Sequence, residues 1–239
     1  MKPYNEEQTK KEQVEEMFDN IAPTYDKLNH IMSLNIDRIW RRRVMRIVRR
    51  SKAHKIMDVA TGTGDLAIAM AKRVDRTHIL GIDLSEEMLA VARQKILKQG
   101  LEERIMIEKG DAENLTMVSD CSIDAATVAF GVRNFENMER GLSEIYRTLK
   151  PEGKLVVLEF SMPHNRFIRW IYSQYAHRLL PCIGAAISKD KQAYTYLPES
   201  VEEFPSPERF CEILQGVGFR SVKRRSQSFG IAYIYEATK

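Results

Sequence analysis

The sequence has few cysteines and no long hydrophobic run, and both shortages restrict what the protein can be. Only three of the 239 residues are cysteines, and no two of them form a CxxC pair; they are Cys121, Cys182 and Cys211. We therefore expect reduced thiols in a cytoplasmic protein, without a disulfide framework or a zinc site. No stretch reaches the ~18–20 apolar residues that a membrane-spanning helix needs. The first seven residues lack the apolar segment of a secretory signal, so no targeting peptide is expected.

Charge is not strongly biased to one sign. Lys and Arg total 37 against 33 Asp and Glu, which gives a net charge of +4. This excess is too small to predict a protein that binds nucleic acid. The chain is 44% apolar and 29% charged, a balance typical of a folded globular protein. Its length favours one α/β unit with appendages.

Short apolar runs alternate with helical patterns through the middle of the chain. Helical spacing follows three of the runs, at 66–70, at 85–100 and at about 137–149. Ser85 precedes Met88 by three residues, which is typical of a helix N-cap. This alternation predicts a mostly parallel sheet with helices on both faces. The runs that we predict as its strands are 55–60, 78–83, 105–108, 123–130 and 155–159.

The segments on either side of this alternation differ from it. Residues 6–20 are predicted as a short amphipathic helix. Residues 37–52 combine apolar positions at helical spacing with seven arginines, which predicts a basic amphipathic helix. Residues 166–187 are rich in large apolar groups, and Pro181 should break any helix there.

The end of the chain is predicted to add a pair of antiparallel strands. A polar link that contains Pro198, Pro205 and Pro207 leads to a helix at about 207–215. Residues 219–226 and 231–238 then read as two strands that can pair as antiparallel neighbours.

Three aspartates near the ends of predicted strands, Asp58, Asp83 and Asp111, are the candidate ligand-binding residues. The first strand runs into Asp58-Val59-Ala60-Thr61-Gly62-Thr63-Gly64-Asp65, where glycines allow a sharp turn and close approach of a ligand to the backbone. Asp83 ends the second strand, where a carboxylate can accept hydrogen bonds from ribose hydroxyls. Asp111, after the third strand, could accept one from an adenine amino group. Parallel strands bring these ends to one edge of the sheet.

Two other interpretations compete at these positions. The three aspartates could merely cap helices, although their common place at strand ends argues against this. A dinucleotide site is the second alternative. The third place of a G-x-G-x-x-G pattern is Ala67 here, which that pattern tolerates, so spacing alone does not exclude NAD.

These elements resemble the nucleotide-binding motifs of the class I S-adenosylmethionine-dependent methyltransferases, with Ala60 in place of the first glycine. Two further stretches resemble the ubiquinone/menaquinone biosynthesis C-methyltransferases. The first is Tyr25-Asp26-Lys27-Leu28-Asn29-His30-Ile31-Met32-Ser33, followed by Trp40. The second is Arg147-Thr148-Leu149-Lys150-Pro151-Glu152-Gly153-Lys154-Leu155. Phe130-Gly131-Val132-Arg133-Asn134 is similar to another family segment, and Asp37 stands where the family usually has His.

The resemblance implies a Rossmann-like enzyme that methylates a ring carbon of a prenylated hydroquinone, demethylmenaquinol or a ubiquinol precursor. It also implies the contacts to S-adenosyl-L-methionine. Thr63 with Gly62 and Gly64 would contact its methionine end, Asp83 its ribose, and Asp111 with Ala112 its adenine. No metal is needed. The ring carbon becomes nucleophilic when a hydroxyl loses its proton, so a base or a cation is expected beside it. The candidates are Arg133, Asn134 and Tyr25, with Asp26 and His30 behind them.

The resemblance also divides the chain by role. We expect one methyltransferase domain with an N-terminal helical cover (1–52), a cofactor-binding core (53–161), a substrate-side insertion (162–205) and a C-terminal helix with a strand pair (206–239). A prenyl tail favours peripheral contact with the inner face of the cytoplasmic membrane, through the basic helix or the aromatic segment. The alternatives for these surfaces are a solvated face and a homodimer contact. A methyltransferase of nucleic acid or of another small molecule is the competing function.

Overall fold

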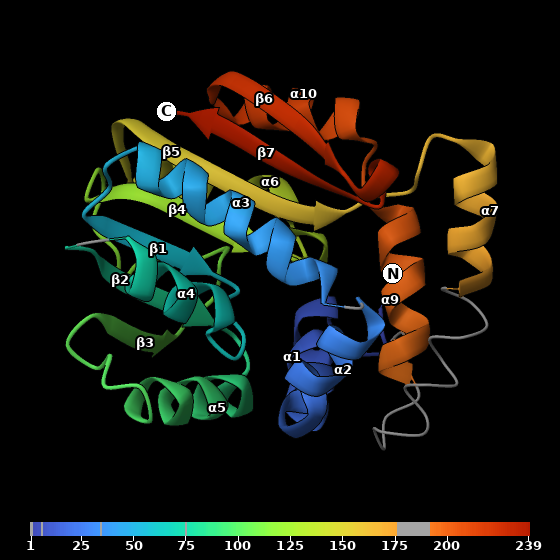
Figure 1. The fold of residues 1–239 in the computed structure, drawn as a ribbon, viewed down its shortest axis with the longest axis horizontal. Coiled ribbons are helices and arrows are strands. Elements are labelled where there is room, and N and C mark those ends of the chain that lie inside the picture. The colour runs from blue at the N-terminus through green and yellow to red at the C-terminus, as the bar shows by residue number, and fades with distance from the viewer. Residues whose placement is uncertain (1, 6, 34, 75, 176–191) are drawn as a thin grey trace.

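Seven strands form one sheet in the order β3-β2-β1-β4-β5-β7-β6 (Figure 1). The computed structural model describes residues 2–5, 7–33, 35–74, 76–175 and 192–239. The first five strands pair in parallel, whereas β7 pairs antiparallel with both β5 and β6. The strands are β1 (Lys55–Val59), β2 (His78–Asp83), β3 (Ile105–Lys109), β4 (Ile123–Ala129), β5 (Leu149–Phe160), β6 (Arg220–Gln227) and β7 (Ala232–Thr238).

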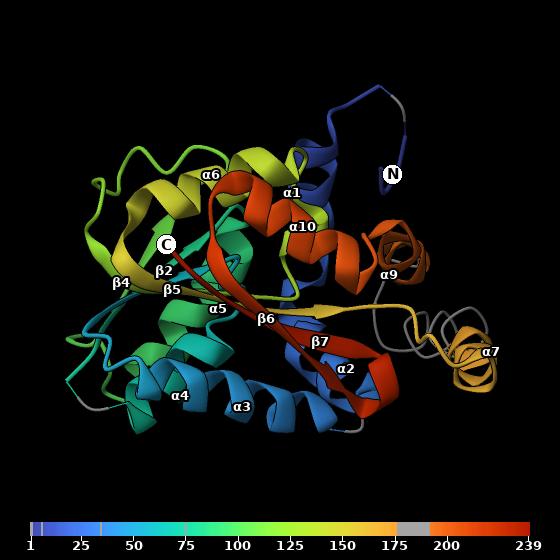
Figure 2. The ribbon, with the colours of Figure 1, turned by 90° about the horizontal axis from the view of Figure 1, so that it is seen from above.

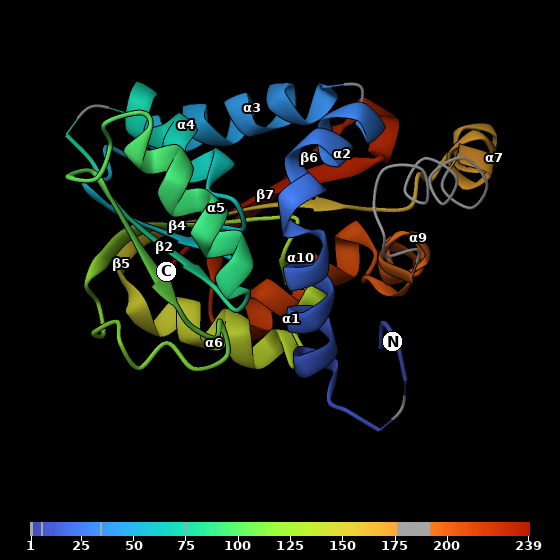
Figure 3. The same cartoon turned by 90° about the horizontal axis from the view of Figure 1, so that it is seen from below.

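Helices cover both faces of the sheet, as the alternation predicted (Figures 2 and 3). One face packs against α3 (Ile36–Arg50), α4 (Asp65–Arg73) and α5 (Glu86–Leu97), and the other against α6 (Met138–Thr148) and α10 (Pro207–Val217). The strands serve both layers because successive side chains point to opposite faces. Ile56 of β1 belongs to the first core, and its neighbour Met57 belongs to the second.

Three further helices lie beyond the carboxyl ends of the parallel strands (Figure 1). They are α1 (Lys10–Ile21), α2 (Tyr25–Met32) and α9 (Gln192–Glu203). Thr9 caps α1 in a reciprocal arrangement with Glu12, so this helix begins four residues later than predicted. A small apolar core joins α1 to α9 through Val14, Met17 and Tyr196.

The prediction of a polar link at Pro198 was wrong, because this proline lies inside α9. The helix has buried residues at 193, 196, 200 and 201, a spacing that suits one helix face, and Pro198 is buried as well. Burial of Tyr196 and Val201 offsets the backbone hydrogen bond that a proline removes from a helix interior. Pro181 and Cys182 lie outside the described residues.

Two other sequence predictions need adjustment. β5 starts at Leu149 rather than 155, because Leu149 pairs with Ile123 before a register shift brings Lys154 opposite Ala125. The C-terminal strands do pair antiparallel, but β7 also joins β5, so β7 connects the edge strand β6 to the parallel sheet.

No helix in the described parts of the chain is long and apolar enough to cross a membrane.

The loops after β1 and β4 pack closely because residue 131 is a glycine and has no side chain. Ala60 adopts φ +53°, a left-handed conformation that costs a residue with a Cβ more than it costs glycine. Its Cβ occupies the space beside Gly131, since a Cβ built on Gly131 would lie 2.4 Å from it. Residue 131 must therefore be glycine while residue 60 is alanine.

We predict that moving the methyl group from residue 60 to residue 131 will show this coupling. Gly131→Ala should lower the free energy of unfolding by about 1–3 kcal/mol through overpacking. Ala60→Gly should raise it by up to about 1 kcal/mol because the left-handed backbone is relieved. The double variant should recover most of the loss in urea unfolding, since the next atom, Val128 Cγ1, is 3.3 Å away. A double variant as unstable as Gly131→Ala would contradict this account.

Candidate active site

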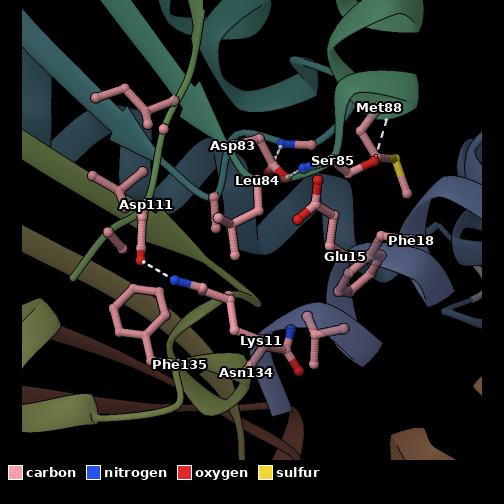
Figure 4. Close-up of a pocket in the computed structure, with 18 of the residues that line it drawn as sticks. Lys11, Glu15, Phe18, Asp83, Leu84, Ser85, Met88, Asp111, Asn134 and Phe135 are labelled. Carbon is pink, nitrogen blue, oxygen red and sulfur yellow. Dashed lines mark hydrogen bonds and ion pairs between the residues drawn. The ribbon is translucent and has the colours of Figure 1, made fainter. Parts of the chain in front are cut away.

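Loops at the carboxyl ends of four parallel strands line one cleft (Figure 4). These ends meet beside β1, which lies between β2 and β4 where the strand order reverses. Open α/β sheets bind ligands at such a point. Of the predicted cofactor residues, four line the cleft: Gly62, Asp83, Asp111 and Ala112. Nothing lies within 4 Å of where a Cβ of Gly62 would stand, so a ligand can approach the backbone there.

Asp83 organises the cleft with both carboxylate oxygens. The Gly62 amide donates to Oδ2 at 2.7 Å, and the Ser85 amide donates to Oδ1 at 3.0 Å. Burial raises the pKa of this carboxyl group above its usual range. Because a carboxylate has about four acceptor sites, the group keeps capacity for a ligand hydroxyl.

Helix α1 forms the cover of this cleft. Lys11 reaches from α1 to Asp111, with 3.0 Å between Nζ and Oδ2, and this contact raises the pKa of Lys11 (Figure 4). Lys10 donates to the carbonyl oxygens of Arg133 and Phe135, each at 2.9 Å. At the other end of the helix, the Ser85 hydroxyl donates to Asp19 at 2.6 Å. The cover is therefore attached to the loops after β2, β3 and β4.

Thr63 and Gly64 shape the turn and are not among the residues that line the cleft. The Thr63 hydroxyl donates to Asp26, whose other oxygen is 2.8 Å from Lys95 Nζ. Gly64 has φ +77° and precedes α4, and a Cβ there would lie 3.2 Å from Ala92. The contact of Thr63 with the methionine end of the cofactor stays a prediction. Asp26 is engaged in this ion pair, and the side chain of His30 lies outside what the structure describes.

A second chamber of about 280 Å³, hereafter the acceptor chamber, adjoins the cleft. Three side chains line both spaces: Phe18, Tyr25 and Phe130. Much of the chamber is apolar and aromatic, and its wall includes Trp40, Phe160, Tyr172 and Tyr196. Phe130 and Phe160 stack with ring centroids 4.5 Å apart, and Trp40 lies about 6 Å from both rings. A flat aromatic ligand fits such a wall.

Arg133 places a buried positive charge in the wall of the acceptor chamber. Its Nη1 lies 2.8 Å from Glu159 Oε1, and the two side chains are 7% and 0% exposed. Burial alone would lower the pKa of Arg133, but the Glu159 carboxylate offsets this and the net shift is upward. The guanidinium therefore stays charged and cannot act as a base.

Asn134 and Tyr25 lie where the two spaces meet. Asn134 lines the cleft, and its Oδ1 is 3.3 Å from the hydroxyl of Tyr196, a residue of the chamber wall. Tyr25 packs edge-on against Phe18, with centroids 6.0 Å apart. Burial raises the pKa of Tyr25, so its hydroxyl is neutral near pH 7. The structure thus brings all three predicted catalytic residues to one region.

A model of the ubiE/COQ5 methyltransferase family matches residues 6–239. The chain belongs to this family. It is 45% identical to a Bacteroides fragilis protein named demethylmenaquinone methyltransferase, over all of this chain and 97% of that one. It is 44% identical to a Geobacter sulfurreducens protein named ubiquinone/menaquinone biosynthesis C-methyltransferase UbiE, over 96% of this chain and 90% of that one.

Solved structures of methyltransferases share the fold. An S-adenosyl-L-methionine-dependent enzyme described as putative, from Methanococcus maripaludis, has a TM-score of 0.62 at 22% identity, covering 98% of this chain and 95% of that one. A SAM-dependent methyltransferase from Aquifex aeolicus has a TM-score of 0.57 at 20% identity, covering 77% and 81%. The Rossmann-like fold class predicted from the sequence is confirmed.

Several features of this ubiE/COQ5 family member escaped the sequence analysis. Glu159 is the last residue of a predicted strand, but no local pattern shows that it pairs with Arg133. Lys11 stands on a polar helix with nothing to mark it as a partner of Asp111. Arg41 reads as one more arginine of a basic helix, yet it lines the acceptor chamber.

Asp58 is hydrogen-bonded to the glycine-rich turn and does not line the cleft. It is 2% exposed and accepts hydrogen bonds from the hydroxyls of Thr61 and Thr127. Burial raises its pKa from 3.8 to about 6. The folded state therefore binds more protons than the unfolded state between about pH 4 and pH 6, and this group lowers stability as pH rises through that window.

We predict that Asp58→Asn removes this pH dependence. Relative to the wild type, the variant should gain about 1 kcal/mol in the free energy of unfolding between pH 5 and pH 7, because wild-type Asp58 acquires a buried charge over that range. Urea unfolding of both proteins at each pH measures the difference, and contributions of other carboxyl groups cancel. A difference that is the same at both pH values would show that Asp58 does not titrate there.

Proposed function

We propose that this chain transfers the methyl group of S-adenosylmethionine to a ring carbon of a prenylated hydroquinone of the demethylmenaquinol type, with a ubiquinol precursor as the alternative acceptor. The observation that carries the proposal is the shared wall of Phe18, Tyr25 and Phe130. These three side chains line both a cleft suited to a nucleoside and an aromatic chamber with a buried cation, so the two spaces meet beside them. The names of the relatives support the same reaction.

The cleft accounts for the parts of the cofactor. Asp83 would accept hydrogen bonds from the ribose hydroxyls, and Asp111 with Ala112 would contact the adenine. Gly62, with Thr63 and Gly64 that shape the turn, would receive the methionine end at the start of α4. Lys11 would then have to share Asp111 with the adenine or move from it. When bound, the cofactor supplies a methyl group activated by a sulfonium leaving group.

The acceptor chamber accounts for the reactivity of the ring. A phenol has a reference pKa near ~10, so a hydroquinone is mostly neutral at pH 7 and its ring carbon is a weak nucleophile. The hydroxyl would give its proton to solvent as the ring binds; the Arg133 guanidinium would stabilise the resulting phenolate, and Asn134 and Tyr25 would orient its oxygen. These side chains would also hold the ring where the chamber meets the cleft, so that its reacting carbon lies in line with the methyl group and the sulfur. After transfer the methylated carbon would lose its own proton to solvent, and the cofactor would leave as the neutral thioether.

The segments outside the core have roles in this proposal. Residues 1–52 act as a cover for the cofactor-binding core (53–161), residues 162–205 as an insertion over the acceptor, and residues 206–239 as the closing helix and strand pair. α7 (Arg166–Gln174) belongs to the insertion and supplies Tyr172 to the chamber.

We also propose that the chain contacts a lipid surface, through exposed apolar side chains of α3, α7 and the turn before β7 that we call the apolar rim: Ile39, Phe167, Trp170, Ile171 and Phe229. Three of these residues lie at one-face spacing on α7, at the outer edge of the molecule (Figures 1 and 2). Trp170 and Phe229 are 61% and 81% exposed.

The apolar rim adjoins the acceptor chamber. Tyr172 of α7 and Tyr175, the C-cap residue of that helix, line the chamber, and Ser228, which precedes Phe229, lines it too. The exposed arginines Arg166 and Arg169 flank the aromatic side chains of α7. Exposed aromatics beside cations suit an anionic lipid interface, from which a prenyl tail would enter. We therefore propose membrane contact at α7 rather than along the whole basic helix.

The reaction is tested with purified protein, methyl-labelled S-adenosylmethionine and reduced lipid extracts that contain demethylmenaquinol and the ubiquinol precursor. We expect label in the demethylmenaquinol product, detected by mass. Asp83→Ala should weaken cofactor binding about 10- to 100-fold, because cofactor hydroxyls and backbone amides lose their partner. Cofactor binding without label in either quinone would overturn the quinone assignment and favour another acceptor. Wild-type affinity in Asp83→Ala would overturn the ribose contact.

Membrane contact is tested by flotation with vesicles of phosphatidylglycerol and phosphatidylcholine. Phe167→Ser with Trp170→Ser should reduce the bound fraction about tenfold or more, because two large apolar groups no longer leave water. Leu97→Ser with Met106→Ser, at equally exposed positions remote from α7, is the matched control and should float like the wild type. Unchanged flotation of the α7 variant would contradict the proposal. Loss of a dimer in light scattering instead would assign this face to a second copy.

A further inference from the structure

Arg41 differs from the other arginines of α3. The helix carries seven arginines, and the other six are exposed. The side chain of Arg41 is only 13% exposed and lies in the wall of the acceptor chamber. Asp37 and Trp40 precede it by four residues and one residue and line the same chamber. Arg41 therefore belongs to the inward face of a helix whose other arginines meet solvent.

A buried carboxylate holds the Arg41 guanidinium in place. Asp37 is 3% exposed, accepts a hydrogen bond from Arg41 Nη1, and also accepts one from the Ser33 hydroxyl at 2.7 Å. Asp65 Oδ2 lies 3.8 Å from the same Arg41 nitrogen. Arg41 Nε is buried and has no hydrogen-bond partner among the described residues. A buried N–H donor without an acceptor is unfavourable, so an oxygen that accepted from it would be bound favourably.

Arg41 and Arg133 flank the same aromatic wall. The guanidinium carbon of Arg41 lies 5.7 Å from the ring centroid of Phe130, and that of Arg133 lies 5.6 Å from the centroid of Phe160. Because these two rings stack on each other, the two cations stand over successive members of one stack. Each is tied to its own buried carboxylate, Asp37 or Glu159.

We propose that Arg41 is a second substrate-binding residue, which donates a hydrogen bond to one oxygen of a para-hydroquinone while Arg133 contacts the other. This inference rests on the proposed function. A para-hydroquinone carries its oxygens at opposite ends of a flat ring, and the chamber offers two cationic donors along one aromatic wall. Arg41 stays protonated, so it takes no proton from the acceptor. Asp37 is a positioning residue that fixes Arg41.

The test compares two probes that differ by one hydroxyl. The binding of 1,4-naphthalenediol and of 1-naphthol, to enzyme loaded with S-adenosylhomocysteine, is measured anaerobically by calorimetry. We expect the wild type to prefer the diol about 10- to 100-fold, the range for a hydrogen bond to a charged group. In Arg41→Gln this preference should disappear while affinity for 1-naphthol is kept. Arg42→Gln, an exposed neighbour, should behave like the wild type.

The outcomes separate this inference from the function on which it rests. Equal affinity of the wild type for both probes, an unchanged preference in Arg41→Gln, or an equal loss for both probes would overturn the role of Arg41. Wild-type protein that binds neither probe would overturn the acceptor assignment itself. If Arg41→Gln fails to bind S-adenosylhomocysteine, Arg41→Lys replaces it. Lysine keeps the charge but not the planar set of N–H donors of a guanidinium, so Arg41→Lys should retain only part of the preference.

Discussion

The ion pair between Arg133 and Glu159 is the interaction on which the rest of the site depends. It joins the loop after β4 to the end of β5, and both side chains are buried. A buried charge is costly unless a partner compensates it, so each residue requires the other. Removing Glu159 would leave an unpaired cation, and removing Arg133 would leave an unpaired carboxylate. The pair allows a mostly apolar chamber to hold a permanent positive charge beside the cofactor cleft.

The close packing of Ala60 against Gly131 sets the distance between the cofactor cleft and the acceptor chamber. Ala60 and Gly131 touch across the loops after β1 and β4, which leaves Phe130 in the wall between cleft and chamber. Helix α1 covers the cleft and is held there by an ion pair and hydrogen bonds to three different loops. Phe18 and Tyr25 complete the wall from the covering helices. Transfer at the junction of these two spaces would be shielded from water, which favours methylation of a carbon over hydrolysis.

Local patterns in the sequence predicted the parallel sheet and its strand ends well. The second strand has the predicted limits, Ser85 caps α5, and Asp83 and Asp111 come to one cleft. These features follow from side-chain periodicity and from turn chemistry, which depend on neighbouring residues. The rule that proline breaks helices misled at Pro198, because tertiary burial of α9 outweighed the lost hydrogen bond.

Contacts between distant segments were not predictable in this way. Lys11 with Asp111 and Arg133 with Glu159 are 100 and 26 residues apart, and no local spacing marks them. Arg41 shows the same limit within one helix. Its charge suggests a solvated face, and only the packing of α3 against β5 shows that this arginine turns inward. The catalytic region therefore emerges from the sequence only in outline.

The central claim is that the cofactor cleft and the acceptor chamber meet at the wall of Phe18, Tyr25 and Phe130. A crystal structure with S-adenosylhomocysteine and a non-reactive demethylmenaquinol analogue tests it most directly. The account predicts the cofactor sulfur where the cleft meets the chamber, and the analogue ring against Phe130 and Phe160 with its reacting carbon facing that sulfur. An analogue ring bound outside the acceptor chamber, or a sulfur turned away from the wall, would contradict it.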